Sequence, residues 1–250
     1  MASTLNRSLE RGIEILRAFR PGSTLLGNGE LAERTGLAPA TVSRLTQTLV
    51  VAGLLDHDRS ARAYRLAAPL LSLAHAMSTG SELLQIAAPR MRAVAEKLRI
   101  NIGLATADRT EMVYLESIRY NNRRPALRTV VSGQRVPIEL TSLGRAWLAA
   151  APLPERTALL KQIAQRRSDW PALRREISAA IAHVHHFGWC TASWQPEVIA
   201  VSTPLLRDNE RGYVLNASIS SSGSPADIAA ELSVPLLTLA RQILQAFEPA

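Results

Sequence analysis

The sequence predicts an α+β protein built from two domains. Its 250 residues exceed the usual size of one domain, and 47% of them are apolar, which is enough for two cores. The first 67 residues combine helical apolar spacings with two short extended runs. The second half contains several apolar strand candidates, mostly joined by short turns, and separate helical runs. This order is typical of an antiparallel sheet with helices packed on it.

The first element predicted is a helix with one apolar face. Ser8 is placed to cap its start, and Pro21-Gly22 to end it. The positions on its apolar face are Leu9, Ile13, Leu16 and Phe19.

Two further helices follow, separated by a tight turn. The segment ELAERTG predicts a short helix, and Gly36 permits the turn after it. A third helix begins near Pro39, a residue suited to the first helical position. Its Val42, Leu45 and Leu49 are spaced three and four apart and are expected to face the core. This order of elements is that of a helix-turn-helix.

The outward side of the third helix carries no acidic residue. The side chains expected there are Ala40, Thr41, Ser43, Arg44, Gln47 and Thr48. An ordinary solvated helix mixes charges of both signs. Short hydroxyl residues allow close approach to phosphates or bases, while Arg44 and Gln47 carry the groups that read guanine and adenine edges. This pattern favours a helix that lies in the major groove of DNA.

A β-hairpin wing is predicted after the third helix. Extended runs at Leu54–His57 and Ala63–Ala67 flank a basic tip at residues 58–62. Three arginines are placed to contact the DNA backbone or minor groove: Arg59, Arg62 and Arg65.

The domains expected are residues 1–67, a helical linker at 68–81 and a second domain at 82–250. The apolar character of the linker favours a packed helix or a dimer contact over a free tether. In the second domain the strand candidates are Ile102–Ala105, Met112–Ile118, Leu127–Val131, Ile199–Leu205 and Tyr213–Ser220. Helices are expected near Glu82–Leu98, Leu143–Ala151, Pro154–Ala164, Trp170–Phe187 and Ala226–Ala246.

Charge and cysteine content narrow the partners and the compartment. The formal net charge of +8 favours a polyanionic partner such as nucleic acid. A single cysteine, Cys190, excludes an internal disulfide framework and is expected in a reducing compartment. No apolar run approaches the roughly 18–20 residues that span a bilayer, and the N-terminus is too polar for a signal peptide. We therefore expect a cytoplasmic protein without membrane insertion.

Ordered sequence blocks cover nearly the whole chain. They are SLERGIEILRAF, ELAERTGLAPATVSRLTQTLVVAGLL and YRLA, then GQRVPIELTSLGRAWLA, FGW, QPEVIAVSTPL and NASIS. With these blocks the sequence resembles the isocitrate lyase regulator (IclR) family of bacterial transcription factors. The resemblance implies a winged helix-turn-helix for double-stranded DNA and a GAF-like antiparallel-sheet domain that binds a small organic effector. It also implies a homodimer or tetramer on palindromic operators, no cofactor and no enzymatic activity.

The resemblance further implies an effector pocket formed by a helix start, an aromatic turn and a strand. The residues at the matching positions are Thr141, Ser142, Leu143, Gly144, Trp189, Cys190, Ser218 and Ser220. The helix start suits an anion, and the strand hydroxyls match groups that bind a carboxylate in the family.

This chain departs from the family pattern at two places. It has CTASW after the aromatic turn, where the family often has acidic residues, and Ala200 where the family has a cysteine. Because Trp189, Trp194 and Leu143 remain nearby, a larger or more apolar effector such as an aromatic acid is expected.

Other readings of the motifs remain open. The segment HVHHFGWC holds three histidines and Cys190, but no carboxylate or second cysteine completes a ligand spacing, so no metal site is expected. The basic run at residues 119–128 fits a solvated hairpin turn as well as a contact with DNA or an acidic effector. The alternative functions are a small-molecule enzyme in residues 81–250 and a winged helix that docks on RNA or protein. No catalytic constellation favours the enzyme.

Overall fold

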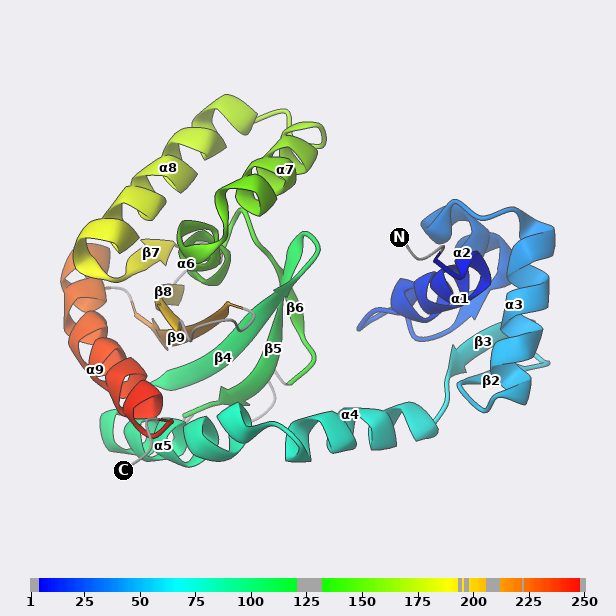
Figure 1. Cartoon of the computed structure of the whole chain (residues 1–250), viewed down its shortest axis with the longest axis horizontal. Helices are drawn as coiled ribbons and strands as arrows, with labels where there is room; N and C mark the ends of the chain where they lie inside the picture. The colour runs from blue at the N-terminus through cyan, green and yellow to red at the C-terminus, as the bar shows by residue number, and fades with distance from the viewer. Residues whose placement is uncertain are drawn as a thin grey trace. The chain divides into compact units, whose positions relative to one another are not determined.

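The computed structural model describes residues 5–120, 132–192, 195, 198–205, 212–221 and 223–247. The chain divides into two compact units, Met1–Gly80 and Ser81–Ala250 (Figure 1). The expected α+β class is confirmed, with a helix-turn-helix in the first unit and an antiparallel sheet in the second. The helix expected in the linker falls within the first unit.

The described part of the first unit contains four helices and a small antiparallel sheet. The helices are α1 (Arg7–Ala18), α2 (Asn28–Thr35), α3 (Pro39–Val51) and α4 (Pro69–Thr79). The strands are β1 (Leu26–Gly27), β2 (Leu55–Asp58) and β3 (Ala63–Leu66), in the order β1-β3-β2. The hairpin of β2 and β3 is the expected wing, and β1 pairs with its second strand.

The end of α2 and the start of α3 lie at the residues expected from the sequence, whereas the cap of α1 does not. Helix α3 begins at Pro39. Helix α2 ends at Thr35 and is followed by its cap Gly36, whose φ of 68° is the left-handed conformation that glycine tolerates. The cap of α1 is Asn6 and not Ser8. The Asn6 Oδ1 accepts hydrogen bonds from the backbone N–H of Ser8 and of Leu9, both at 3.1 Å.

The buried face of α1 overlaps the predicted one only in part: Phe19 is buried and Leu16 packs against the core as predicted, but Leu9 and Ile13 are exposed. Ile15 is fully buried and Phe19 is 8% exposed, whereas Leu9 is 64% and Ile13 is 42% exposed. Two apolar stripes overlap on this helix, and Gly12 lies on the buried one. Local spacing alone cannot tell which stripe packs on the rest of the unit.

The buried face of α3 is centred on a threonine that the apolar spacing passes over. Val42 and Leu49 are buried as predicted, while Leu45 is only half-buried. Thr46 is fully buried, and its hydroxyl bonds to the carbonyl of Val42 at 3.0 Å and to Asn28 Oδ1 at 3.4 Å. The start of α2 is thereby tied to the middle of α3.

The described part of the second unit contains a six-stranded sheet in the order β6-β5-β4-β9-β8-β7, with every neighbouring pair antiparallel. The strands are β4 (Asn101–Asp108), β5 (Glu111–Ile118), β6 (Arg135–Pro137), β7 (Cys190–Ala192), β8 (Val198–Leu205) and β9 (Tyr213–Ser220). The helices are α5 (Glu82–Leu98), α6 (Ser142–Ala150), α7 (Leu153–Ala164), α8 (Trp170–Phe187) and α9 (Pro225–Gln245). The three-residue edge strands β6 and β7 were not predicted, because they are too short to show a pattern. The strand expected at Leu127–Val131 lies outside the described residues.

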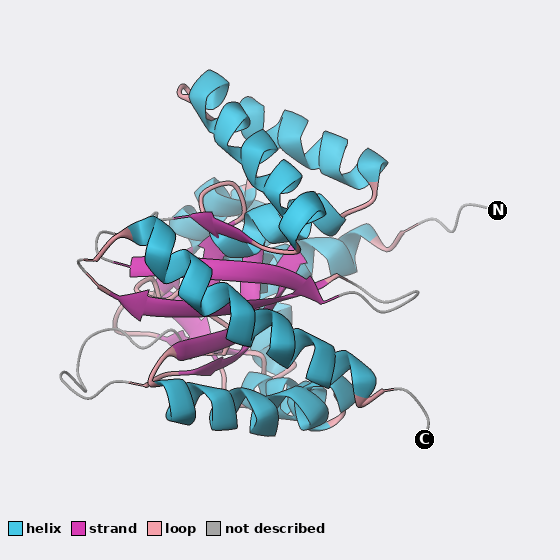
Figure 2. Cartoon of the chain, turned by 90° about the vertical axis from the view of Figure 1, so that its left-hand side faces the viewer, coloured by secondary structure: helices cyan, strands magenta, loops and turns pink. Residues whose placement is uncertain are grey.

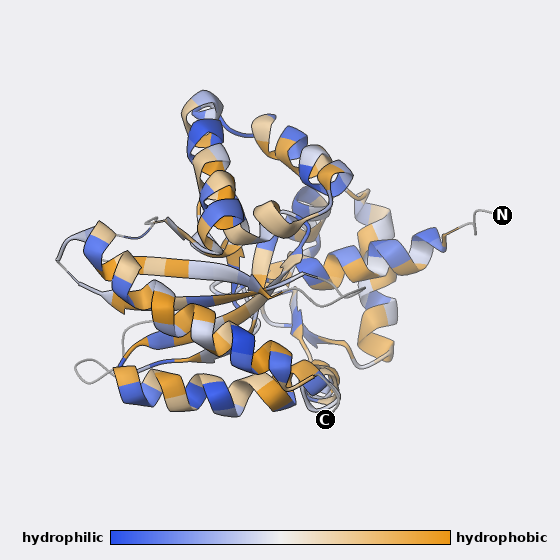
Figure 3. Cartoon of the chain, turned by 60° about the vertical axis from the view of Figure 1, so that its left-hand side comes forward, coloured by the Kyte–Doolittle hydropathy of each residue, from blue (hydrophilic) through white to orange (hydrophobic). Residues whose placement is uncertain are grey.

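Helices cover both faces of this sheet (Figure 2). Helices α5 and α9 pack on one face, where Met91 and Leu236 meet Leu104 and Leu215 of the central strands. Helices α6, α7 and α8 form the second core with Tyr114 and other residues of the opposite face. The helices over the sheet carry both hydrophobic and hydrophilic residues, as expected for helices with one side on a sheet and the other in solvent (Figure 3).

Gly144, in the first turn of α6, lies against the backbone of Ile138. A Cβ atom at this glycine would overlap the Cα, carbonyl carbon and carbonyl oxygen of Ile138. Because backbone cannot rotate away as a side chain can, only glycine permits this approach. The contact sets how closely the start of α6 sits on the strand and loop before it.

We expect Gly144→Ala to lower the free energy of unfolding by about 1–3 kcal/mol, the usual cost of forcing extra volume into a packed interior. Guanidinium denaturation of the full chain measures this change. Gly12→Ala is the matched control, because nothing lies within 4 Å of a Cβ at that buried helical position. The control should raise stability by roughly 0.5–1 kcal/mol. Wild-type stability in Gly144→Ala would contradict the close approach.

Candidate DNA interface and ligand cavity

The outward side of α3 presents polar groups without acidic neighbours. Ala40, Arg44, Gln47 and Thr48 are exposed. Thr41 and Ser43 are half-buried, and the first turn of the helix contains no acidic residue. Among the residues that the structure describes, Arg44 has no carboxylate partner, and the hydroxyl of Thr48 donates to the Arg44 carbonyl at 3.0 Å. Arg44 and Gln47 therefore have long, exposed side chains whose polar groups are accessible on the surface of α3.

The turn of the wing is held by one carboxylate. Asp58 Oδ1 accepts hydrogen bonds from the Ser60 N–H at 3.1 Å, the Ser60 hydroxyl at 2.6 Å and the Ala61 N–H at 3.1 Å. Its Oδ2 pairs with the guanidinium of Arg65. These contacts, the Ser60 hydroxyl first, lower the pKa of Asp58. Arg65 is thus engaged within the wing, and its expected contact with the DNA backbone or minor groove stays a prediction.

Arg59 and Arg62 remain exposed at the tip of the wing. Arg62 has a φ of 50°, which is the left-handed region. A non-glycine residue there costs roughly 1–2 kcal/mol. Residues in such strained backbone conformations are found preferentially at functional sites, where the function of the side chain outweighs the free-energy cost of the strain.

A cavity of about 70 Å³ lies between the sheet and the first turn of α6 in the second unit. Five of the eight residues expected in the effector pocket line it: Thr141, Ser142, Leu143, Ser218 and Ser220. The described lining contains one cation, Arg119, and no acidic residue. The cavity is therefore suited to an anion.

The first turn of α6 offers two backbone donors. The Thr141 hydroxyl accepts the N–H of Gly144 at 3.2 Å and donates to the Pro137 carbonyl at 2.8 Å. The N–H groups of Ser142 and Leu143 come before the first intrahelical donor, and the structure gives them no partner among the residues described. Unpaired N–H groups and the helix dipole together favour a negative charge at this point.

The other three expected residues do not line the cavity. Gly144 turns toward the loop before α6. Trp189 packs against the core on the α5 and α9 side of the sheet, and its carbonyl lies 2.7 Å from Nδ1 of His183. Cys190 is buried behind the helix start, where its thiol donates to the Ser142 carbonyl at 3.5 Å. The aromatic turn of Trp189 and Cys190 therefore does not contribute its side chains to the cavity.

The sequence reasoning did not single out Tyr114 and Asn216, two polar residues of the lining, while Arg119 belongs to a basic run for which a contact with an acidic effector was one of the alternatives. Burial raises the pKa of Tyr114 to about 12, although the charge of Arg119 and the Asn216 side chain oppose this. Burial also lowers the pKa of Arg119, and Tyr114 opposes that shift. Asn216 could have been found, because strand alternation places it on the same face as Ser218. Arg119 opens a basic run whose remainder, from residue 121, lies outside the described residues.

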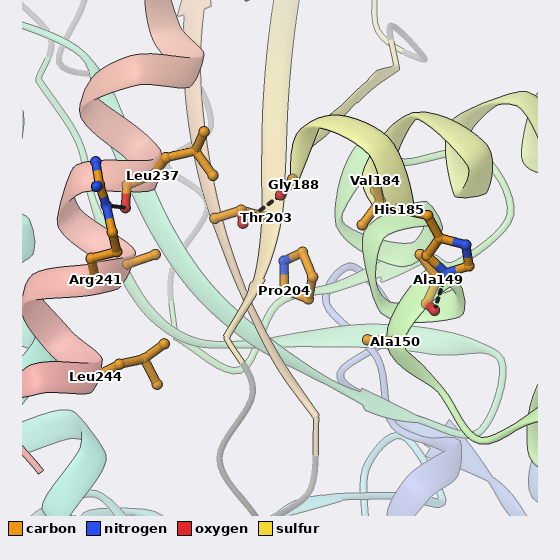
Figure 4. A pocket seen from close by; sticks show the side chains of 11 residues that line it. Ala149, Ala150, Val184, His185, Gly188, Thr203, Pro204, Leu237, Arg241 and Leu244 are labelled. Atoms are coloured by element: carbon orange, nitrogen blue, oxygen red, sulfur yellow. Dashed lines mark hydrogen bonds between the residues drawn. The ribbon is translucent and has the colours of Figure 1, made fainter. Parts of the chain in front are cut away.

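A larger groove of about 630 Å³ lies between α6, α8, β8 and α9 (Figure 4). Its walls are mostly alanine, leucine and valine side chains. Two of its polar groups are already bonded: His185 Nε2 to the Ala149 carbonyl at 3.0 Å and the Thr203 hydroxyl to the Gly188 carbonyl at 2.7 Å. Arg241 also lines it and bonds within its own helix, with Nε 3.4 Å from the Leu237 carbonyl. The groove thus has one cation in its described lining, but not the several convergent polar groups of the smaller cavity.

The described residues hold no group of three or more His, Cys, Asp or Glu side chains arranged for a metal ion. The helices in the described part of the chain are also too short or too polar to cross a membrane.

Two family comparisons cover most of the chain. Residues 8–59 match the IclR helix-turn-helix domain, and residues 75–245 match the C-terminal domain of the bacterial transcriptional regulator IclR. The chain belongs to the IclR family. The expected family, fold class and absence of enzymatic activity are confirmed, because the matched families and relatives are regulators of transcription.

Individual relatives agree with this assignment. The chain is 34% identical over 186 residues to the HTH-type transcriptional regulator TsaQ1/TsaQ2 of Comamonas testosteroni, covering 74% of this chain and 66% of that one. It is 27% identical to XynR of Escherichia coli K12 over 89% of each chain. An IclR family regulator from Brucella abortus superposes with a TM-score of 0.90 at 32% identity, over 99% of this chain and 94% of that chain.

A more distant structure has the same fold with a ligand bound. An IclR homolog from Microbacterium hydrocarbonoxydans, complexed with 4-hydroxybenzoate, superposes with a TM-score of 0.64 at 23% identity, over 94% of this chain and 99% of that chain.

The buried thiol predicts an alkaline loss of stability. Burial raises the pKa of Cys190 to about 12, against 9.0 for an unperturbed thiol, and the charge of Arg145 opposes the shift. Between these values the native state keeps a proton that the unfolded state has lost. The free energy of unfolding should therefore fall as pH rises through this window, by up to about 1.4 kcal/mol per pH unit from this group.

Urea denaturation of wild type and Cys190→Ala from pH 8 to pH 11 tests this prediction. The wild-type curve should fall more steeply with pH, while Tyr114 contributes equally to both proteins. Parallel curves would show that the thiol is not held protonated by burial.

Proposed function

We propose that this IclR family member is a sequence-specific DNA-binding transcriptional regulator whose operator binding is modulated by a small organic carboxylate. The observation that carries the DNA part is the outward side of α3, where Arg44 and Gln47 are exposed beside small residues and no acid. A bacterial operator lies in the cytoplasm, which is therefore the compartment we expect.

Each residue of the interface has a distinct part in this proposal. Arg44 and Gln47 read base edges in the major groove. The small residues Ala40, Thr41 and Ser43, with the methyl group of Thr48, let the helix approach closely. On the wing, Arg59 and Arg62 contact phosphates or the minor groove.

A palindromic operator needs two copies of this interface. Half-sites lie about 34 Å, one helical turn, or a multiple of that apart, so two recognition helices must be held at a matching distance. Helix α4 contains no buried residue, and Leu71, Leu73 and Met77 are 76%, 60% and 51% exposed. Apolar side chains gathered on one exposed helix mark an interaction surface. We propose that a second copy of the chain covers it, as a homodimer or as half of a tetramer.

The cavity beside α6 supports the carboxylate effector. Its free backbone donors, the Arg119 cation and the Ser218 and Ser220 hydroxyls suit an anion. The reason for expecting an aromatic acid is weaker in this chain, because Trp189 lies elsewhere and Trp194 is outside the described residues. An aromatic effector is supported by the ligand of the Microbacterium homolog alone.

Selection of bound sequences from random duplex DNA by the full chain, at near-physiological salt, tests the proposal. A palindrome with half-sites about one turn or a multiple apart is expected. Indifference to sequence would favour the RNA-docking or protein-docking alternative.

Arg44→Ala should cost about 1–3 kcal/mol of operator affinity and relax preference at one position in each half-site, because a bidentate contact to guanine is lost. Arg174→Ala is the control, since it removes the same charge from an exposed position on α8. Equal losses on all sequences would make Arg44 a phosphate contact instead.

Arg62→Gly separates strain from DNA binding. Relief of the left-handed conformation should keep or raise the free energy of unfolding, by up to about 1 kcal/mol. DNA affinity should fall by a similar factor on all sequences. The slope of log affinity against log salt concentration should also become shallower by about the amount that one phosphate contact contributes. Fluorescence anisotropy at several salt concentrations measures both effects. Wild-type affinity in this variant would remove Arg62 from the interface.

A further inference from the structure

Asn216 carries a buried acceptor without a partner. It lies in the middle of β9, is 5% exposed, and pairs with Ser202 of β8 on one side and Gly103 of β4 on the other. Within the described part of the chain, its Oδ1 atom accepts no hydrogen bond. A buried polar atom left unpaired costs about 1–3 kcal/mol, and such atoms are few in native proteins. This one lines the cavity.

The neighbouring strand makes room for this amide. A Cβ atom at Gly103 would overlap both Asn216 Oδ1 and the ring of Tyr114. Gly103 is therefore the position over which the two polar side chains meet, on the face of the sheet that α6 covers. The Asn216 side chain also hydrogen-bonds to Tyr114. That contact accounts for part of its polarity, and Oδ1 is the atom left unpaired among the described residues.

A carboxylate alone does not satisfy this site. The start of α6, Arg119 and the strand hydroxyls all favour a negative group, but Asn216 Oδ1 is itself an acceptor and needs a donor. An ammonium group would face Arg119 with no acidic residue in the described lining to balance it. A neutral hydroxyl meets the requirement without that repulsion.

The size of the cavity limits the rest of the ligand. Its volume of about 70 Å³ is roughly half of the ~150 Å³ of an engineered cavity that admits benzene. This favours a short aliphatic chain over an aromatic ring.

We infer that the cavity recognises a short aliphatic hydroxycarboxylate, whose carboxylate lies at the start of α6 and whose hydroxyl donates to Asn216 Oδ1. The inference rests on the proposed function in taking this cavity as the effector site. It makes Asn216 the residue that distinguishes a hydroxy acid from the same acid without the hydroxyl.

Calorimetric titration of the full chain with matched pairs of acids tests this inference. The aliphatic pairs are glycolate with acetate and lactate with propionate, and the aromatic pair is 4-hydroxybenzoate with benzoate. Wild type should bind the hydroxy member of an aliphatic pair at least about tenfold more tightly, because its partner leaves Oδ1 unpaired. Both aromatic acids should bind more weakly than the preferred aliphatic one.

Asn216→Leu keeps a branched side chain and removes the acceptor. In this variant the ratio of affinities within each aliphatic pair should fall to about one, while the acid without the hydroxyl still binds. Asn216→Ala provides the same comparison if the leucine variant does not fold. Ser218→Ala is the control, and it should weaken both members of a pair by a similar factor because its hydroxyl serves the carboxylate.

Four results would overturn the inference: equal binding of both members by wild type, an unchanged ratio in the Asn216 variants, tighter binding of the aromatic pair, or no binding of any acid. Its failure is distinguishable from that of the proposed function. Equal binding within pairs would leave a carboxylate-responsive regulator intact. If the protein discriminates within pairs but binds DNA without regard to sequence, the proposed regulatory function is wrong while the hydroxy acid site stands.

Discussion

The ligand cavity depends on the close approach of α6 to the backbone before it. With no side chain at Gly144, the first turn of the helix rests directly on Ile138. Thr141 caps this turn, and the Ser142 hydroxyl bonds to that of Ser202 on β8 at 2.8 Å. The helix start is thus fixed to both the preceding loop and the sheet. Its free N–H groups are thus held in place by contacts within the protein, so a ligand bound there as proposed would not have to order them.

Strand β9 serves the core and the cavity at once. Leu215 and Ala217 are buried under α5 and α9, while Asn216 and Ser218 face α6. A shift in register by one residue would exchange these sets, and would bury polar groups in the apolar core. The apolar packing of one face therefore fixes which polar groups line the cavity on the other. This coupling is why a polar residue such as Asn216 can be held in a buried position.

Local sequence patterns predicted the helix ends and the exposed side of α3, because neighbouring residues determine these features. Pro39 and Gly36 marked the ends of their helices, and the spacing in α3 identified its outward side. The errors came from contacts between distant residues, which spacing does not contain. The choice of Ile15 over Ile13 as the buried residue of α1 depends on what packs against that helix. The role of Trp189 was carried over from the family resemblance, whereas strand β7 and helix α8 direct it to the other side of the sheet.

Binding of a hydroxyl at Asn216 would affect helix α5, the first helix of the second unit, through strands β4 and β5 of the sheet. Asn216 lies over Gly103 on β4 and beside Tyr114 on β5, and α5 packs on these same two strands from the opposite face. Helix α5 begins at Glu82, two residues after the first unit ends at Gly80. A ligand can shift an equilibrium only by the ratio of its affinities for the two states. A tenfold ratio corresponds to about 1.4 kcal/mol, so one hydrogen bond made in only one state would change operator occupancy measurably. The acid without the hydroxyl would lack that difference, and it would occupy the cavity without changing DNA binding to the same extent.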